Sequence, residues 1–166
     1  MVDSGNQIQQ GYASFYQVYQ SMVDTALARP PQAEIQASWW RTGNQAEFYV
    51  QVHNLHTVTL SSEVNGAAVH AIVYEEARVG VTGRFGRAAV ESGITSLAPD
   101  GSATFRLGTA DLGDVNWDKL FAVVLVDYRP SGLAGRCDML QAAVAERKTD
   151  GLTARPETVY LPLAVR

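Results

Sequence analysis

The stretch FAVVLVDY, Phe121–Tyr128, is the longest nearly uninterrupted apolar run of the chain. It is rich in β-branched residues and predicts a central strand. Successive side chains of a strand point to opposite faces, so both faces of this strand are apolar and need cover. We therefore expect either a second sheet on one face and a helix on the other, or a closed barrel.

Composition limits the size and the partners of the protein. The chain has 166 residues, of which 46% are hydrophobic and 18% charged, as expected for one domain with extensions. The net charge is -4 and no run of Lys or Arg is longer than two. A nucleic-acid-binding protein would carry a clustered basic face, so we expect no nucleic-acid partner.

The cysteine count and the hydropathy pattern limit which disulfides, metal sites and membrane segments the chain can form. Cys137 is the one cysteine, which excludes an intrachain disulfide and a cysteine-rich zinc site. No window of about 18 apolar residues predicts a membrane span. The first residues lack the basic and apolar regions of a secretory signal, so an exported protein is expected to carry its signal ahead of this sequence.

Apolar residues at helical spacing predict an amphipathic helix over residues 7–28. The helix must end before Pro30-Pro31, because proline lacks an N–H and restricts the residue before it. We expect its tyrosines Tyr12, Tyr16 and Tyr19 to fill the core with their hydroxyl groups at the edge. An aromatic platform for a ligand is the alternative.

After the double proline the apolar period changes to two, which is typical of strands. Residues 34–41 and 47–54 alternate and flank the turn Thr42-Gly43-Asn44, which predicts a hairpin. Further strands are expected at 69–76, 102–107, 121–128 and 139–146. Residues 54–68 predict an edge strand or loop, and residues 77–89 predict an irregular or bulged return. The segments 94–97 and 102–107 flank Ala98-Pro99-Asp100-Gly101, a turn sequence, and predict a hairpin.

This pattern indicates an all-β fold, an immunoglobulin-like antiparallel β-sandwich of seven to eight strands preceded by one N-terminal amphipathic α-helix. We divide the chain into the helix at 1–29, the sandwich at 30–146, and a polar tail at 147–166. The tail ends in an apolar segment, 158–166, that can add an edge strand.

Groups that could perform catalysis are few. His53, His56 and His70 could bring imidazoles together around a metal, but their spacing is unspecific and no Cys or Asp completes a site. Cys137 lies between an Arg and an Asp whose effects on a thiolate oppose each other, which favours an unreactive thiol. No nucleophile or pair of carboxylates is recognisable, so we expect no enzyme activity and no metal or cofactor.

Tryptophans are the candidate aromatic binding residues. Trp39 and Trp40 are adjacent on one strand, so one of them must point outward. That outward ring and Trp117 are candidates to contact a ligand. A carbohydrate-binding module would need an exposed row among Trp39, Trp40, Tyr49 and Trp117.

One resemblance covers about two-thirds of the chain. It is carried by the segments Val73–Glu76, Val81–Phe85, Arg87–Ala89, Val115–Trp117, Val126–Pro130 and Asp138–Ala143. With them, residues 31–146 resemble the immunoglobulin-like sandwich that follows thioredoxin-like regions in exported bacterial proteins of the Omp28-related kind. The resemblance implies an extracellular or cell-envelope location and an accessory domain of a longer multidomain chain. The Cys-x-x-Cys of the thioredoxin-like part is absent, so no redox activity is implied.

From these observations we expect a non-catalytic module that contacts a protein or a glycan, or acts as a spacer. A metal-assisted hydrolase or lyase around the three histidines and a carbohydrate-binding module are the alternatives. Loop ends of such sandwiches commonly meet ligands. The loop that follows the central strand therefore supplies our candidate binding residues: Asp127, Tyr128, Arg129, Arg136 and Asp138.

Overall fold

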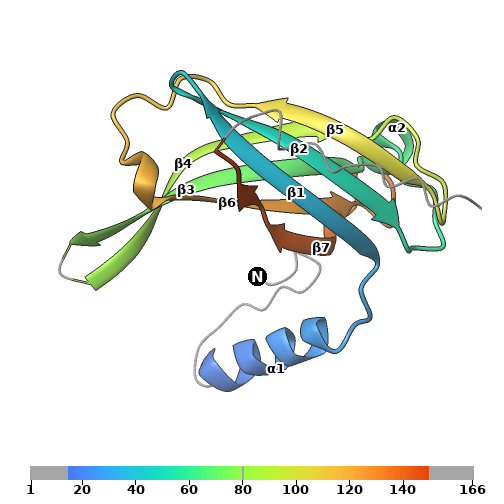
Figure 1. Cartoon of the computed structure of the whole chain (residues 1–166). Coiled ribbons are helices and arrows are strands. Elements are labelled where there is room, and N and C mark those ends of the chain that lie inside the picture. Colours follow the sequence, from blue (N-terminus) through green and yellow to red (C-terminus); the bar gives the residue numbers. More distant parts are fainter. Residues whose placement is uncertain (1–14, 80, 150–166) are drawn as a thin grey trace, which may run out of the picture.

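The computed structural model describes residues 15–79 and 81–149. Within them, one helix, α1 (Phe15–Leu27), precedes eight strands (Figure 1). The strands are β1 (Ala33–Thr42), β2 (Gln45–Asn54), β3 (Ala68–Val79), β4 (Val81–Gly93), β5 (Ser102–Gly108), β6 (Leu120–Tyr128), β7 (Asp138–Val144) and β8 (Glu146–Arg147). Two short helical segments, α2 (Ser62–Asn65) and η2 (Trp117–Lys119), lie in the connections. The expected β-rich fold with an N-terminal helix is confirmed.

The strands form two four-stranded sheets around one hydrophobic core. Sheet 1 has the order β5-β2-β1-β8, and sheet 2 has the order β4-β3-β6-β7. Every pair is antiparallel except β1 with β8. The core is built from the inward side chains of both sheets, including Phe48, Val50, Val69 and Val124.

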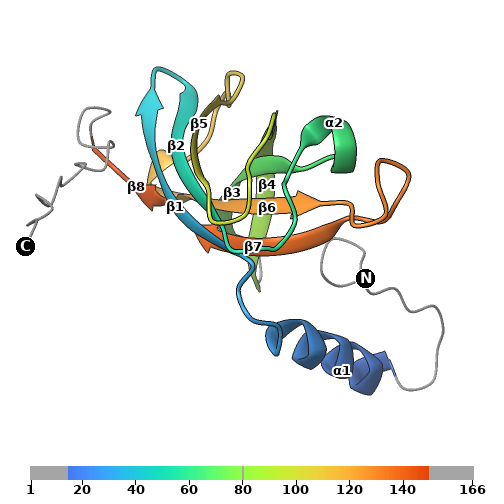
Figure 2. The same ribbon diagram turned by 90° about the vertical axis from the view of Figure 1, so that its right-hand side faces the viewer.

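The apolar run of the sequence is β6, which lies between β3 and β7. Its inward side chains, such as Val124 and Val126, are fully buried against sheet 1. The expectation of cover on the other face is wrong, because Phe121 on that face is 40% exposed. Figures 1 and 2 both show α1 standing away from the two sheets, on the side of β7.

The predicted hairpins have different outcomes. The hairpin of β1 and β2 is confirmed, with its turn at Gly43. The hairpin predicted over 94–107 is wrong: β5 pairs with β2, and Leu97 instead forms an isolated bridge with Leu60. The turn at Ala98–Gly101 exists, with a 3.0 Å hydrogen bond between its ends. It carries the chain between the sheets, because the apolar side chains of β5 find their cover beside β2.

Two connections take a definite form in the structure. The irregular or bulged return predicted over 77–89 is bulged: it falls in the long hairpin of β3 and β4, whose register shifts once, between Val73 and Tyr74. The loop predicted over 54–68 contains the helical turn α2, whose C-cap Gly66 adopts a left-handed conformation. Asn65 stabilises this turn through its side-chain oxygen, which accepts a hydrogen bond from the backbone N–H of Ser61.

The predicted helix is confirmed over Phe15–Leu27, but its burial differs from the prediction. Residues 7–14, including Tyr12, lie outside the described residues. Met22 is buried, whereas Tyr16 and Leu27 are each 78% exposed. The described part of the apolar face is therefore only partly covered: Tyr16 does not fill the core, whereas Tyr19 is partly buried.

The sandwich continues past the boundary expected at residue 146. Glu146 and Arg147 pair with β1, and the backbone N–H of Lys148 donates to Trp39 O at 2.8 Å. The predicted edge strand at 158–166 lies outside the described residues. Across 15–79 and 81–149 no helix has the length and hydropathy to cross a membrane.

Candidate functional site

The loop end after β6 brings together the predicted binding residues, but it uses most of them internally. The backbone N–H of Arg129 donates to Asn65 O at 2.7 Å. Its guanidinium donates to the carbonyl oxygens of Leu133 and Gly135, at 2.9 and 3.2 Å. Arg129 therefore holds the loop of residues 129–135 closed. Arg136 is exposed and forms no ion pair with any described residue.

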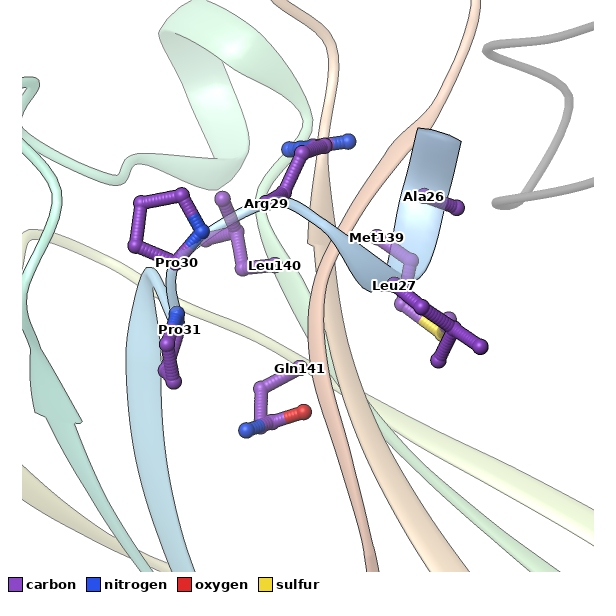
Figure 3. A pocket seen from close by; sticks show the side chains of 8 residues that line it. All are labelled: Ala26, Leu27, Arg29, Pro30, Pro31, Met139, Leu140 and Gln141. Carbon is purple, nitrogen blue, oxygen red and sulfur yellow. The ribbon is translucent and has the colours of Figure 1, made fainter. Parts of the chain in front are cut away.

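Asp138 at the start of β7 binds the linker that leaves α1. Arg29 Nη1 and Nη2 lie 2.7 and 3.1 Å from its two carboxylate oxygens, and Nη2 also donates to Gln32 at 2.9 Å. Figure 3 shows Arg29 beside Pro30 and Leu140 in a cavity of about 330 Å³ between the end of α1 and β7. This carboxylate fixes the linker and is therefore not available to a ligand.

Asp127 and Tyr128 point to opposite faces of β6. Tyr128 is buried, and its hydroxyl lies 3.3 Å from His56 Nε2. Burial raises the pKa of Tyr128, and the negative charge of Asp138 raises it further. Tyr128 therefore stays a neutral phenol in the interior, whereas Asp127 faces the outside of sheet 2.

His70 on β3 lies between two carboxylates. Its Nε2 is 3.0 Å from Asp127 on β6, and its Nδ1 is 3.6 Å from Glu91 on β4. The hydrogen bond to Asp127 raises the pKa of His70, and the negative charges of Asp127 and Glu91 raise it further against the opposing effect of burial. The imidazole therefore links three strands of sheet 2 through its two nitrogens.

Cys137 lines the same cavity as His70, a space of about 330 Å³ that also reaches Arg129 and Leu133. A catalytic thiol would need an imidazole nitrogen directed at it. Both nitrogens of His70 face carboxylates instead, and Cys137 has no hydrogen bond to any described residue. The arrangement is consistent with an unreactive cysteine.

The three histidines do not converge. His53 Nδ1 lies 3.0 Å from Ser102 Oγ in sheet 1, while His56 and His70 contact residues on opposite faces of β6. Within the described ranges no three His, Cys, Asp or Glu side chains are placed to hold a metal ion. The metal-assisted alternative therefore has no assembled site in this part of the chain.

The tryptophans occupy three different environments. Trp39 is 1% exposed and stacks on Phe48 in the core, with Arg147 over its ring at 5.3 Å, which removes it from the candidate binding aromatics. Trp117 is partly buried beneath Arg41, whose Cζ is 4.4 Å from the ring centroid. Trp40 points outward and is partly exposed. No aromatic or cationic side chain of the described residues lies over it.

The pairing register places Trp40 on the outer face of sheet 1 among polar side chains. Four cross-strand rows make up this face, which we call the sheet 1 face. They are Trp40, Glu47 and Gly108; Ser38, Tyr49 and Arg106; Gln36, Gln51 and Thr104; and Glu34, His53 and Ser102. Sequence reasoning missed the two glutamines, Thr104 and Arg106. Their alternation was visible in the sequence, but their neighbours depend on the pairing of β2 with β5.

The sheet 1 face has a distinct polar end. A cavity of about 210 Å³ is lined there by Glu34, Gln36, Gln51, His53 and Ser102, together with Val52. Tyr49 lies between this cavity and Trp40, and Arg106 Cζ sits 6.0 Å from its ring centroid. Aromatic rings therefore occupy one end of the face, and hydroxyl, amide and carboxylate groups occupy the other.

No family model matches the sequence, and no curated protein matches it at a significant level. Among solved structures, the chain is similar to the sporulation control protein Spo0M from Bacillus subtilis, with 10% identity and a TM-score of 0.41 over 72% of this chain and 50% of that one. It is also similar to the alkylpurine DNA glycosylase AlkC from Pseudomonas fluorescens, with 11% identity and a TM-score of 0.38 over 80% of this chain and 35% of that one. The chain spans half or less of either protein. At these TM-scores the similarities carry no conclusion about function.

Proposed function

We propose that this chain is a non-catalytic accessory module of immunoglobulin-like type, part of an exported bacterial protein, and that it contacts a protein or a glycan. The strand order supports the immunoglobulin-like class. Sheet 2, β4-β3-β6-β7, corresponds to the order C′-C-F-G, and β5-β2-β1 corresponds to E-B-A. The connections from β2 to β3, β4 to β5 and β5 to β6 each change sheet, as in a Greek key.

The observation that carries the non-catalytic role is the internal pairing of the loop-end charges. A general acid, base or nucleophile must direct a free atom toward its substrate. Here His70 faces Asp127 and Glu91, and Asp138 is bound by Arg29. These groups stabilise the sandwich and its linker. A partner would therefore contact other residues on the surface of the sandwich.

Cell fractionation of the native host with an antibody against the chain tests the exported location. We expect the protein in the envelope fraction or the culture medium. Recovery in the cytoplasmic fraction alone, with a cytoplasmic marker enzyme as control, would contradict the proposal.

A panel of ester, glycoside and phosphoester substrates tests the absence of catalysis. We expect no turnover of any of these substrates by the wild type beyond the rate measured with His70→Ala or with Cys137→Ser. Turnover that is lost in His70→Ala while the variant keeps its near-ultraviolet circular dichroism would refute the non-catalytic role.

A further inference from the structure

We propose that the sheet 1 face binds a neutral oligosaccharide, laid along the strands from Trp40 toward the cavity at His53. This inference rests on the proposed function and names its partner as a glycan. It is carried by one aromatic ring without an internal partner, by the neutral polar row beside it, and by the charge of the face.

Trp40 is the aromatic group for a sugar ring. Trp39 and Trp117 have their rings engaged by Phe48 and Arg41, whereas Trp40 has no such partner among the described residues. A tryptophan ring on a strand face offers a large, rigid apolar surface at small entropic cost. The C–H face of a pyranose ring complements that surface, since it is the apolar side of an otherwise hydroxylated molecule.

The next two rows supply hydrogen-bonding groups. Tyr49 lies diagonal to Trp40 across the β1–β2 pair, a relation that separates side chains by about 7–8 Å. Arg106 is held over Tyr49 and presents guanidinium donors beside it. Gln36 and Gln51 follow, with amide groups that both donate and accept. Sugar hydroxyl groups require this combination of donors and acceptors.

The charge of the face favours a neutral ligand over an acidic one. Glu34 and Glu47 contribute negative charge, and Arg106 contributes positive charge. Glu146 of β8, which pairs with Ser38, forms an ion pair with Lys148, so the face has no net positive field. An acidic polysaccharide or a nucleic acid would need a basic surface. The middle row, with two glutamines and Thr104, is uncharged, which matches an uncharged polyol.

The dimensions of the face suit a chain of several sugar units. Four rows at a rise of about 3.3 Å per residue span roughly 20 Å, and three strands about 4.8 Å apart span roughly 10 Å. The cavity of about 210 Å³ at Glu34, His53 and Ser102 closes one end. A side chain or end group of the oligosaccharide can enter it, whereas the Trp40 end is open.

Tryptophan fluorescence and calorimetry with neutral hexasaccharides test this inference. The probes are cellohexaose, maltohexaose, chitohexaose and mannohexaose, with an oligogalacturonate as the acidic comparison. We expect saturable binding of at least one neutral hexasaccharide and weaker binding of the acidic one. Trp40→Ala should lower the affinity by about tenfold or more, the change that ~1.4 kcal/mol produces.

The control is Phe121→Ala, which removes an exposed aromatic ring from the outer face of sheet 2 and should leave the affinity unchanged. If Trp40→Ala does not fold, Gln51→Ala and Thr104→Ala should each weaken binding in a folded protein. No binding of any neutral hexasaccharide at millimolar concentration overturns the glycan inference and leaves the accessory role standing. Equal loss in Phe121→Ala, or tighter binding of the oligogalacturonate, overturns it as well.

Discussion

The ion pair between Arg29 and Asp138 should be a major stabilising contact between the linker and sheet 2. Two hydrogen bonds of 2.7 and 3.1 Å join the side chains, which are only 24% and 11% exposed. Removing one partner of a buried pair costs about 3–5 kcal/mol, and a hydrogen bond to a charged group contributes roughly 1.5–3 kcal/mol. Since solvent reaches Arg29, we expect Arg29→Ala to lower the free energy of unfolding by about 2–3 kcal/mol.

A double-mutant cycle measures this contact directly. Urea unfolding of the wild type, Arg29→Ala, Asp138→Ala and the double variant should give a coupling energy of about 2 kcal/mol. Arg84→Ala is the matched control, because its ion pair with Glu76 is exposed and its loss should change stability little. A coupling energy below ~0.5 kcal/mol, typical of surface pairs, would refute our interpretation of the linker as anchored.

Three further outcomes follow from the structure. Because the pKa of His70 is raised in the folded protein, protonated His70 should stabilise the fold most below about pH 6.5 and lose this effect as the pH rises through the raised value. The difference in melting temperature between the wild type and His70→Gln should therefore shrink from pH 5 to 8.5. A constant difference would contradict this prediction. Gly66→Ala should lower the free energy of unfolding in urea more than Gly43→Ala does. Both glycines have a left-handed backbone, in which a side chain costs about 1–2 kcal/mol. In addition, a Cβ at Gly66 would lie 3.3 Å from Arg129, whereas a Cβ at Gly43 would meet nothing within 4 Å. Phe48→Ala should lower the free energy of unfolding by about 3–5 kcal/mol, and a loss under ~1 kcal/mol would mean that the core repacks.

The sequence was sufficient to predict strands, faces and the local hairpin of β1 with β2, but not the partners of strands that are distant in sequence. Alternation identified β2 correctly, because Phe48 and Val50 must point to the core. The same alternation suggested that 94–97 pairs with 102–107, since the intervening turn chemistry is that of a hairpin. The turn has that chemistry but β5 pairs with β2, a long-range choice that local pattern does not encode.

The helix α1 also shows that the sequence predicts local structure better than tertiary contacts. Its helical spacing is local and was predicted correctly over Phe15–Leu27. Its burial depends on a partner surface, and Tyr16 and Leu27 point to solvent. The charged residues at the end of β6 and after it were predicted to bind a ligand, because their ion-pair partners, Arg29 and His70, are distant in sequence. Alternation predicted that one of Trp39 and Trp40 faces the core but not which one, and the structure buries Trp39.

These differences bear on where a partner would bind. A polar side chain at a loop end signals a binding site only if the fold leaves it without an internal mate, and Asp127, Arg129 and Asp138 all have such mates. An outward aromatic ring on a flat strand face has the opposite property, because a sheet satisfies its backbone but provides no cover for its outer side chains. Trp40 meets that condition among residues of well-defined register. The sheet 1 face is therefore a better candidate for recognition than the loop end.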